Sequence, residues 1–252
     1  MKLTNPLKTT LNSGNVSIGS WLNLASPLAA EILATEGFEW LTVDLEHGPW
    51  GSADAANGFR AIESRGAVPL ARVWSHQPEV IARVLDAGAL GLVIPHVSNR
   101  TQAEALVQAV RYPPFGERSA GTGRNQSFTD YAAQANDQIL LIPQIEDLEG
   151  VDQIQEIMSV DGIDIGFIGP HDLGLSMGLR SDEIGQNVEH ERQLMRVLEG
   201  CQKVGKPAGL PVPDAKSAKK WISRGFQMID LSNDLALLRQ SVRSQLLEVN
   251  QS

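Results

Sequence analysis

The feature that most constrains the fold of this chain is the regular alternation of short apolar runs with longer amphipathic stretches. Several runs are rich in β-branched residues and apolar almost throughout, which is typical of parallel strands that helices cover. We predict eight such strands, at residues 16–22, 39–45, 67–73, 91–95, 138–146, 164–168, 207–211 and 226–231.

The stretches between these runs carry signals for the start and end of helices. Ser26 precedes Pro27, which places a capping side chain before a proline at the first helical position. The same stretch reaches Gly37, and glycine readily takes the left-handed conformation that ends a helix. Similar signals recur at 52–66, 77–88 and 214–225, so strand and helix are predicted to alternate along the chain.

Eight strand–helix units within 252 residues predict a (β/α)8 TIM barrel, an α/β fold, formed by one domain that spans residues 1–252. A doubly wound sheet is the main alternative, but it seldom needs eight units and no Gly-x-Gly-x-x-Gly follows the first strand. Two gaps, 96–137 and 169–206, are too long for simple connections, so we expect functional lids or interface segments there.

Composition narrows the classes of partner. The chain has 21 basic and 30 acidic side chains and a net charge of −9, which disfavours binding to nucleic acid or to a membrane surface. The N-terminus lacks an apolar signal core, and no apolar run is long enough to span a membrane. A single cysteine cannot form an internal disulfide, so we expect a cytoplasmic protein that binds a small molecule.

In a TIM barrel, the reactive side chains project from the carboxyl ends of the strands. The predicted strand ends hold an acidic cluster with one arginine and two histidines, namely Trp21, Asp44, Glu46, His47, Arg72, Gln144, Glu146 and the segment Gly169-Pro170-His171-Asp172. No lysine ends a central strand, so a Schiff-base mechanism has no obvious nucleophile. The cluster therefore favours acid–base or metal chemistry.

Glu146 and Asp172 follow neighbouring strands, so their carboxylates could converge on one divalent cation. Oxygen ligands without thiolates suit Mg²⁺ or Mn²⁺ best, and Co²⁺ or Zn²⁺ are further candidates. Two carboxylates also leave coordination positions for water and substrate, as a catalytic metal needs. The alternative is that these acids are solvated loop residues or helix caps.

Three further residues are candidates for catalysis. His47 follows two acids at a strand end, a setting typical of a general base, although a lone histidine is more often structural. Arg72 ends an apolar strand and needs an anionic partner, either the acidic cluster or a substrate carboxylate or enolate. Asp86 lies in a helix two residues before Gly88, and is either a surface acid or a partner of His47.

Taken together, these residues resemble the HpcH/HpaI family of metal-dependent (class II) pyruvate aldolases. That family includes the 4-hydroxy-2-oxoheptanedioate and 2-keto-3-deoxy sugar acid aldolases. The resemblance covers nearly the whole chain through motifs at residues 19–21, 40–47, 71–73, 85–88, 111–114, 144–146, 167–170 and 172–173. Each motif is weak alone, but their combination is highly specific.

The resemblance implies a role for each residue of the cluster. Glu146 and Asp172 take the positions of the metal ligands, while His47 takes that of the general base and Asp86 that of its acidic partner. Arg72 takes the position that faces the pyruvyl oxygen. The substrate-binding positions fall on Trp21, Gln144, Gly169, Pro170 and His171. His171 departs from the family, whose members usually carry a small residue there, so we expect an altered pocket.

The implied activity is the reversible cleavage of a 4-hydroxy-2-oxo acid to pyruvate, or a close analogue, and an aldehyde. The implied assembly is a homo-hexamer, a trimer of dimers that exchange C-terminal helices, here residues 233–248. One alternative is an acyl-CoA lyase of the malyl-CoA or citrate lyase beta type, for which Arg111, Arg118 and Arg124 are the only diffuse basic candidates. The other is a non-catalytic barrel that binds an oxo acid.

Overall fold

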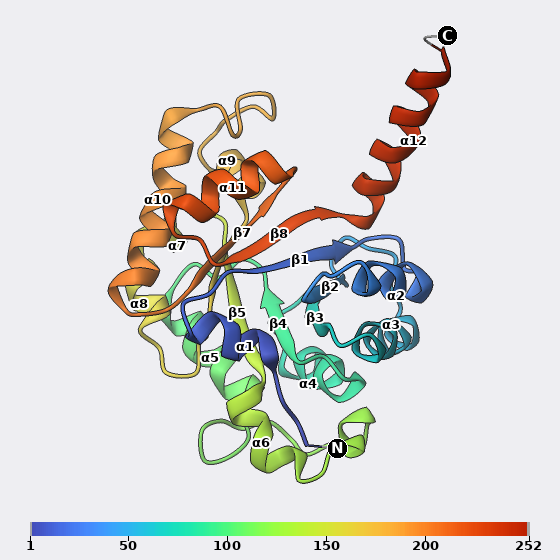
Figure 1. Cartoon of the computed structure of the whole chain (residues 1–252). Helices are drawn as coiled ribbons and strands as arrows, with labels where there is room; N and C mark the ends of the chain where they lie inside the picture. Colours follow the sequence, from blue (N-terminus) through green and yellow to red (C-terminus); the bar gives the residue numbers. More distant parts are fainter. Residues whose placement is uncertain (1, 251–252) are drawn as a thin grey trace.

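The computed structural model, which describes residues 2–250, is a closed barrel of eight parallel strands that neighbour one another in sequence order (Figure 1). The first strand also pairs with the last, which closes the ring. The strands are β1 (Ser17–Leu22), β2 (Trp40–Asp44), β3 (Val68–Arg72), β4 (Gly91–Ile94), β5 (Leu140–Ile145), β6 (Gly166–Ile168), β7 (Ala208–Val212) and β8 (Met228–Asn233). The predicted TIM barrel is therefore confirmed, while residues 1, 251 and 252 of the predicted domain lie outside the described range.

Helices connect the strands and form the outer layer. They are α1 (Pro6–Asn12), α2 (Pro27–Thr35), α3 (Ser52–Ser64), α4 (Pro78–Ala87), α5 (Arg100–Val110), α6 (Tyr131–Gln138), α7 (Leu148–Asp152), α8 (Ile154–Met158), α9 (Pro170–Ser176), α10 (Val188–Lys203), α11 (Ala215–Arg224) and α12 (Asp234–Asn250), with the 3-10 helix η1 (Arg124–Ser127). The predicted cap of α2 is present, since Ser26 Oγ accepts from the Ala29 amide at 3.2 Å, whereas α3 and α4 begin after Gly51 and Gln77 without a side-chain cap. Gly88 and Gly225 end α4 and α11 in the left-handed conformation.

The strands are buried on both faces, which explains why they read as continuous apolar runs. Every residue of β2, β3, β4 and β5 is buried. One face of the strands points into the barrel and the other packs against the helices, as in parallel sheets generally. On α4, Ile81, Val84 and Leu85 are buried and lie on one apolar face of the helix.

The amino ends of the strands are closed by the N-terminal segment. Leu7 and Leu11 of α1 are buried, and Asn5 Nδ2 donates to the carbonyl oxygens of Leu90 and Gln138 at 2.9 and 2.8 Å. The long insertion at residues 111–138, which contains η1 and α6, precedes β5 and lies at this same end near the N-terminus (Figure 1). The insertion therefore cannot line the mouth formed by the strand ends of its own chain.

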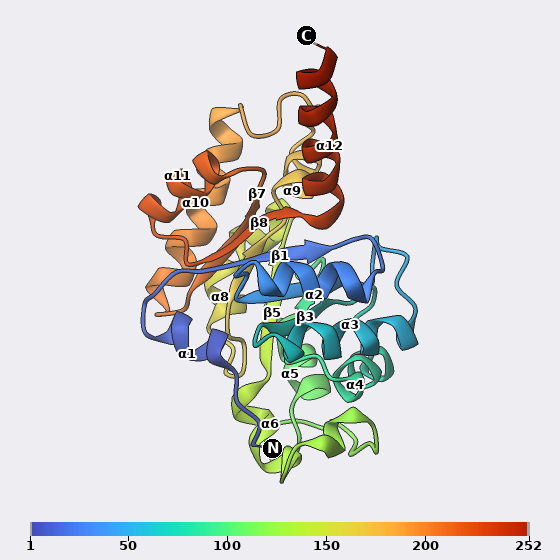
Figure 2. The same cartoon turned by 45° about the vertical axis from the view of Figure 1, so that its right-hand side comes forward.

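Two segments lie at the opposite end, where the strands terminate. The loop and helix after β6, residues 169–187, flank the mouth, and α12 leaves the barrel directly after β8. In both views α12 extends away from the rest of the chain (Figures 1 and 2). Its apolar side chains Leu238, Val242 and Leu246 are exposed, so the rest of this chain does not cover them. Within residues 2–250, no helix combines the length and apolarity that crossing a membrane requires.

Candidate active site

A cavity of about 460 Å³ opens at the carboxyl ends of the strands. Side chains from seven of the strands, or the segments directly after them, contribute to its wall. They include Trp21, Asn23, Asp44, His47, Arg72, Gln144, Phe167, Gly169, Pro170, His171, Asp172, Pro211, Asp230 and Asn233. Most of the predicted site residues therefore share one cavity, and Glu146 lies directly behind its wall.

A buried ion pair between Arg72 and Asp44 forms one side of the cavity. The register of the barrel pairs the two residues across β2 and β3, which brings their side chains together. Arg72 donates from Nε to Asp44 Oδ1 at 2.9 Å and from Nη2 to Oδ2 at 2.7 Å. Burial alone would raise the pKa of Asp44, but the hydrogen bonds and charge of Arg72 outweigh it and hold this pKa below its usual value. The predicted anionic partner of Arg72 is thus Asp44.

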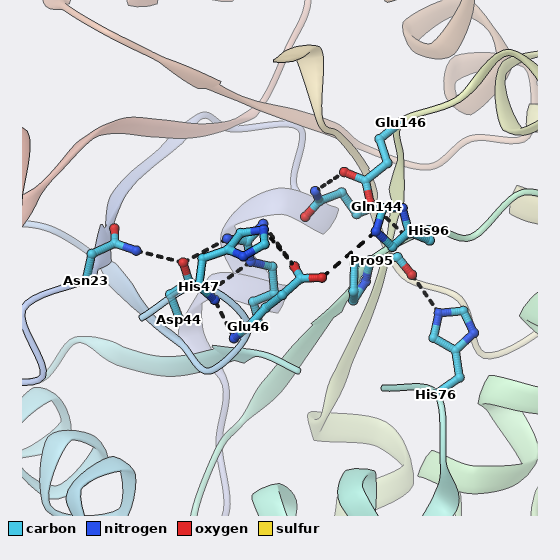
Figure 3. A network of polar contacts seen from close by, with 10 residues as sticks. Asn23, Asp44, Glu46, His47, His76, Pro95, His96, Gln144 and Glu146 are labelled. Atoms are coloured by element: carbon cyan, nitrogen blue, oxygen red, sulfur yellow. Dashed lines mark hydrogen bonds and ion pairs between the residues drawn. The ribbon is translucent and has the colours of Figure 1, made fainter. Parts of the chain in front are cut away.

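Asp44 also organises the loop that follows β2. Its Oδ1 accepts from the amides of Glu46 and His47 at 3.2 and 3.3 Å, and its Oδ2 accepts from Asn23 Nδ2 at 2.7 Å (Figure 3). Glu46 turns back toward the cavity, where its Oε2 lies 3.2 Å from Arg72 Nη1. One arginine is therefore held between two carboxylates, with its orientation set by both.

His47 lies at the rim of the mouth, with its side chain 66% exposed, and its Nε2 is 3.8 Å from Glu46 Oε2. The structure does not bring Asp86 to His47. Asp86 precedes the amino end of β4, at the opposite end of the barrel, where it accepts from Arg118 Nη2 at 2.8 Å and Asn125 Nδ2 at 3.1 Å. Within one chain, the carboxylate beside His47 is that of Glu46.

Glu146 is held from two sides behind the cavity. Its Oε1 accepts from the His96 amide at 2.7 Å and lies 3.1 Å from His96 Nδ1, while its Oε2 accepts from Gln144 Nε2 (Figure 3). His96 reaches this position through a left-handed backbone, with φ 54°. Burial raises the pKa of Glu146, and the nearby charge of Asp172 adds to the rise. A side chain on Gly169 would collide with Glu146 and Gln144, so glycine permits this close packing.

Asp172 and His171 stand at the start of α9, directly after β6, and both line the cavity. The helix begins at Pro170, whose carbonyl oxygen is 2.7 Å from Nε2 of His190 on α10. This bond ties the outer helix to the wall of the cavity, a contact that the sequence did not predict. His171 is exposed at the mouth, where its imidazole is free to meet a ligand.

The oxygen donors in this region fit a hard divalent cation. Glu146 and Asp172 are close enough for their charges to interact, and Gln144 Oε1 is buried without a hydrogen-bond partner. Among residues 2–250, no three histidine, cysteine, aspartate or glutamate side chains form a complete metal cluster. Mg²⁺ typically takes one or two carboxylates and completes its shell with water and substrate oxygens, so two carboxylates and an unpaired amide oxygen suit it.

Trp21 packs over the charged side of the cavity. The Arg72 guanidinium carbon lies 4.2 Å from the centroid of the Trp21 ring, and Phe167 stacks on the same indole at 6.0 Å. Stacking against an aromatic face fixes the plane of a guanidinium and shields it from water. Trp21 Nε1 is buried and has no partner in the described chain, so it remains available to a ligand.

Asn23 and Asp230 are two acidic or amide residues among the cavity residues that lie outside the predicted set. Asn23, just after β1, positions Asp44, and the predicted end of β1 could have indicated it. Asp230 lies in the middle of β8, where a search confined to strand ends does not find it. The sequence does indicate Asp230 as a candidate, because acidic residues are rarely buried and this one lies within an otherwise apolar strand.

The three arginines considered for CoA phosphates are all engaged elsewhere. Arg111 is buried and pairs with Asp164, Arg118 with Asp86, and Arg124 with Glu63. All three follow α5, at the closed end of the barrel. They therefore provide no basic surface beside the mouth.

Known proteins resemble this chain over almost its full length. Residues 17–241 match the sequence model of the family described as HpcH/HpaI aldolase/citrate lyase. The chain is 36% identical to a hydroxypyruvate/pyruvate aldolase of Roseovarius nubinhibens, with 96% of each protein covered. It is 35% identical to a 2-keto-3-deoxy-L-rhamnonate aldolase of Klebsiella pneumoniae, over 97% of this chain and 92% of that protein. A crystal structure of an HpcH/HpaI aldolase/citrate lyase family protein from Burkholderia cenocepacia J2315 matches with a TM-score of 0.92 and 35% identity, over 98% of this chain and 100% of that one.

Proposed function

Because the chain belongs to the HpcH/HpaI aldolase/citrate lyase family, we propose that it is a metal-dependent pyruvate aldolase, with residues 1–252 as one catalytic domain. It reversibly cleaves a 4-hydroxy-2-oxo acid to pyruvate, or a close analogue, and an aldehyde. The observation that carries the proposal is one cavity at the strand ends, lined by an anchored Arg72 and by Asp172, with the Glu146 carboxylate directly behind its wall.

Glu146 and Asp172 are the residues that would hold the divalent cation, with Gln144 Oε1 beside them. Mg²⁺ or Mn²⁺ suits these oxygen donors best. When bound, the cation supplies Lewis acidity that stabilises negative charge on the oxygens of the oxo acid. His96 and Gln144 keep Glu146 in place through hydrogen bonds that do not depend on substrate.

Arg72 supplies fixed positive charge where the enolate oxygen develops as the C3–C4 bond breaks. Asp44, Glu46 and the Trp21 ring hold its guanidinium in one orientation before substrate arrives. A preorganised charge of this kind stabilises the transition state without moving during the reaction. Trp21, Gln144, Gly169, Pro170 and His171 line the cavity and are the proposed substrate-binding residues.

His47 takes the proton from the 4-hydroxyl group as the carbon–carbon bond breaks, and returns it in the aldol direction. Its position at the rim, facing the cavity, suits a base that acts on the part of the substrate nearest the mouth. Within one chain Glu46 is the carboxylate available to orient the imidazole. Asp86 could serve His47 only across an interface between copies, because it lies at the other end of the barrel.

We also propose that the protein forms a homo-oligomer, a hexamer built as a trimer of dimers, in which α12 packs against a neighbouring copy. Leu238, Val242 and Leu246 are exposed along α12, and apolar helix faces of this kind usually pack against a partner. Light scattering after size-exclusion chromatography tests this. Replacing the three residues with serine should lower the oligomeric mass, and an unchanged mass would contradict the proposal.

The activity is tested by measuring pyruvate release from a 4-hydroxy-2-oxo acid, with malyl-CoA as the competing substrate. An aldolase should release pyruvate from the oxo acid and leave malyl-CoA intact, because the arginines that could bind CoA phosphates are paired at the closed end. Cleavage of malyl-CoA alone would favour the acyl-CoA lyase. Pyruvate binding without exchange of its C3 protons in D₂O would favour the non-catalytic barrel.

A further inference from the structure

Asp230 lines the cavity although no step of the proposed mechanism uses it. The residue is only 5% exposed, and its Oδ1 has no hydrogen-bond partner in the described chain. Its neighbours across the sheet are Gly19 on β1 and Pro211 on β7. Neither has a polar side chain, so these two neighbours offer Asp230 Oδ1 no side-chain partner.

The carboxyl group of Asp230 is also not neutralised by the nearby arginine. Arg72 directs its guanidinium to Asp44 and Glu46, and forms no ion pair with Asp230. Burial raises the pKa of Asp230 well above its usual value, the charge of Asp44 adds to the rise, and Arg72 acts in the opposite direction. The rise favours the protonated carboxylic acid, which can both donate and accept a hydrogen bond.

Leaving a polar group buried and unpaired in a binding cavity costs free energy, unless a ligand or a water molecule pairs with it. Pyruvate has polar atoms only on C1 and C2. Under the proposed function these oxygens would be bound by Arg72 and by a cation that Glu146 and Asp172 would hold. Pyruvate alone would therefore leave Asp230 unpaired.

The depth of the residues indicates which substrate carbon lies near Asp230. The C4-hydroxyl group belongs beside His47, whose side chain is 66% exposed at the rim. Asp230 lies deep in the cavity, and the charged groups that act on it are Arg72 and Asp44. Since Arg72 faces the oxygen on C2 and shares the cavity with Asp230, a substituent on the adjacent carbon C3 is within the part of the substrate that can approach Asp230.

We propose that Asp230 is a specificity-determining residue, which hydrogen-bonds a hydroxyl group on C3 of the oxo acid and makes the enzyme favour hydroxypyruvate over pyruvate. The inference rests on the proposed aldolase function and adds its preferred class of nucleophile. A site built to pair with a substrate hydroxyl discriminates strongly against the analogue that lacks it.

The test compares kcat/KM for hydroxypyruvate and for pyruvate, each with the same aldehyde, in wild type and three variants. Asp230→Leu should reduce the preference for hydroxypyruvate about 10–100-fold, since the hydroxyl then loses its partner. Asp230→Asn should keep part of the preference, because an amide also donates and accepts. Ile229→Val is the control, because Ile229 is the neighbour of Asp230 on β8 and does not line the cavity. This variant should keep the full preference for hydroxypyruvate.

The outcomes separate this inference from the aldolase function itself. A wild type that turns over both oxo acids without preferring hydroxypyruvate overturns the role of Asp230, even if Asp230→Leu does not fold. A folded Asp230→Leu with the wild-type ratio overturns it as well. A wild type that uses neither oxo acid, with or without added Mn²⁺, overturns the aldolase function on which the inference rests.

Discussion

Arg72 and Asp44 form a two-pronged buried ion pair in which Nε and Nη2 of the arginine reach both oxygens of the aspartate, at 2.9 and 2.7 Å. The pair follows from the register of β2 and β3, which places the two residues side by side. A guanidinium fixed at two points keeps its remaining nitrogen and its plane in a defined position. This relationship underlies the proposed role of Arg72 at the enolate.

Replacing Arg72 with lysine should lower kcat for pyruvate release about 10²–10³-fold, the usual effect of losing one preorganised donor. Lysine retains the positive charge but cannot bond both Asp44 oxygens or stack flat on Trp21. The matched control is Arg180→Lys, because Arg180 forms the same two-pronged contact with Asp182, at 3.1 Å for each bond, on the exposed surface. Wild-type turnover in Arg72→Lys would show that the enolate does not depend on this geometry.

His47→Ala should lower the rate of carbon–carbon bond cleavage about 10²–10⁴-fold, as expected for loss of a general base. Pyruvate affinity should change little, because His47 lies at the rim and contacts Glu46 rather than the deep end of the cavity. Steady-state kinetics and pyruvate titration separate the two effects. His76→Ala is the control, since that ring bonds the Pro95 carbonyl oxygen and does not line the cavity. Equal losses in both variants would remove the case for His47 as the base.

The ring of His96 should contribute to metal affinity through its contact with Glu146. Residues that orient a metal ligand typically change affinity about 10–100-fold when they are removed. His96→Gly deletes the ring and tolerates the left-handed backbone at φ 54°, whereas His96→Ala also strains it. Titration with Mn²⁺ should show weaker binding in both variants, more so in His96→Ala. Unchanged binding in His96→Gly would limit the role of residue 96 to its backbone amide.

Asp230 should make the folded state less stable as pH rises. Burial raises its pKa in the folded chain, so between the unfolded and folded pKa values the folded state binds more protons. Stability from this group is complete below the unfolded pKa and is lost as pH increases toward the folded pKa. Asp230→Asn should therefore gain stability over wild type as pH rises, in urea unfolding at a series of pH values. Parallel curves for the two proteins would indicate that the Asp230 carboxyl is ionised in the folded state.

The barrel and the residues at its strand ends could be predicted from the sequence because apolar runs and capping signals are local features. The predicted ends of β3 and β5, at residues 73 and 146, each lie one residue beyond the observed ends at Arg72 and Ile145. The pairing of Arg72 with Asp44 could not be predicted, since strand register depends on how the whole barrel closes.

Other parts of the site depend on features that residue types do not reveal. The contact between His96 and Glu146 needs a left-handed backbone at a non-glycine residue, which strand propensity does not predict.

The position of Asp86 at the closed end of the barrel could have been predicted from the sequence, because a residue just before the amino end of a strand lies opposite the mouth. The resemblance to the family suggested a partnership with His47 that one chain does not form.

Removing and restoring divalent metal during pyruvate release from a 4-hydroxy-2-oxo acid tests the metal-dependent aldolase activity most directly. Treatment with EDTA followed by desalting should abolish release, because two carboxylates and Arg72 alone cannot stabilise the enolate. Addition of Mn²⁺ or Mg²⁺ should restore it. Full activity in the metal-free enzyme, or covalent trapping of substrate by borohydride, would contradict the metal-dependent mechanism.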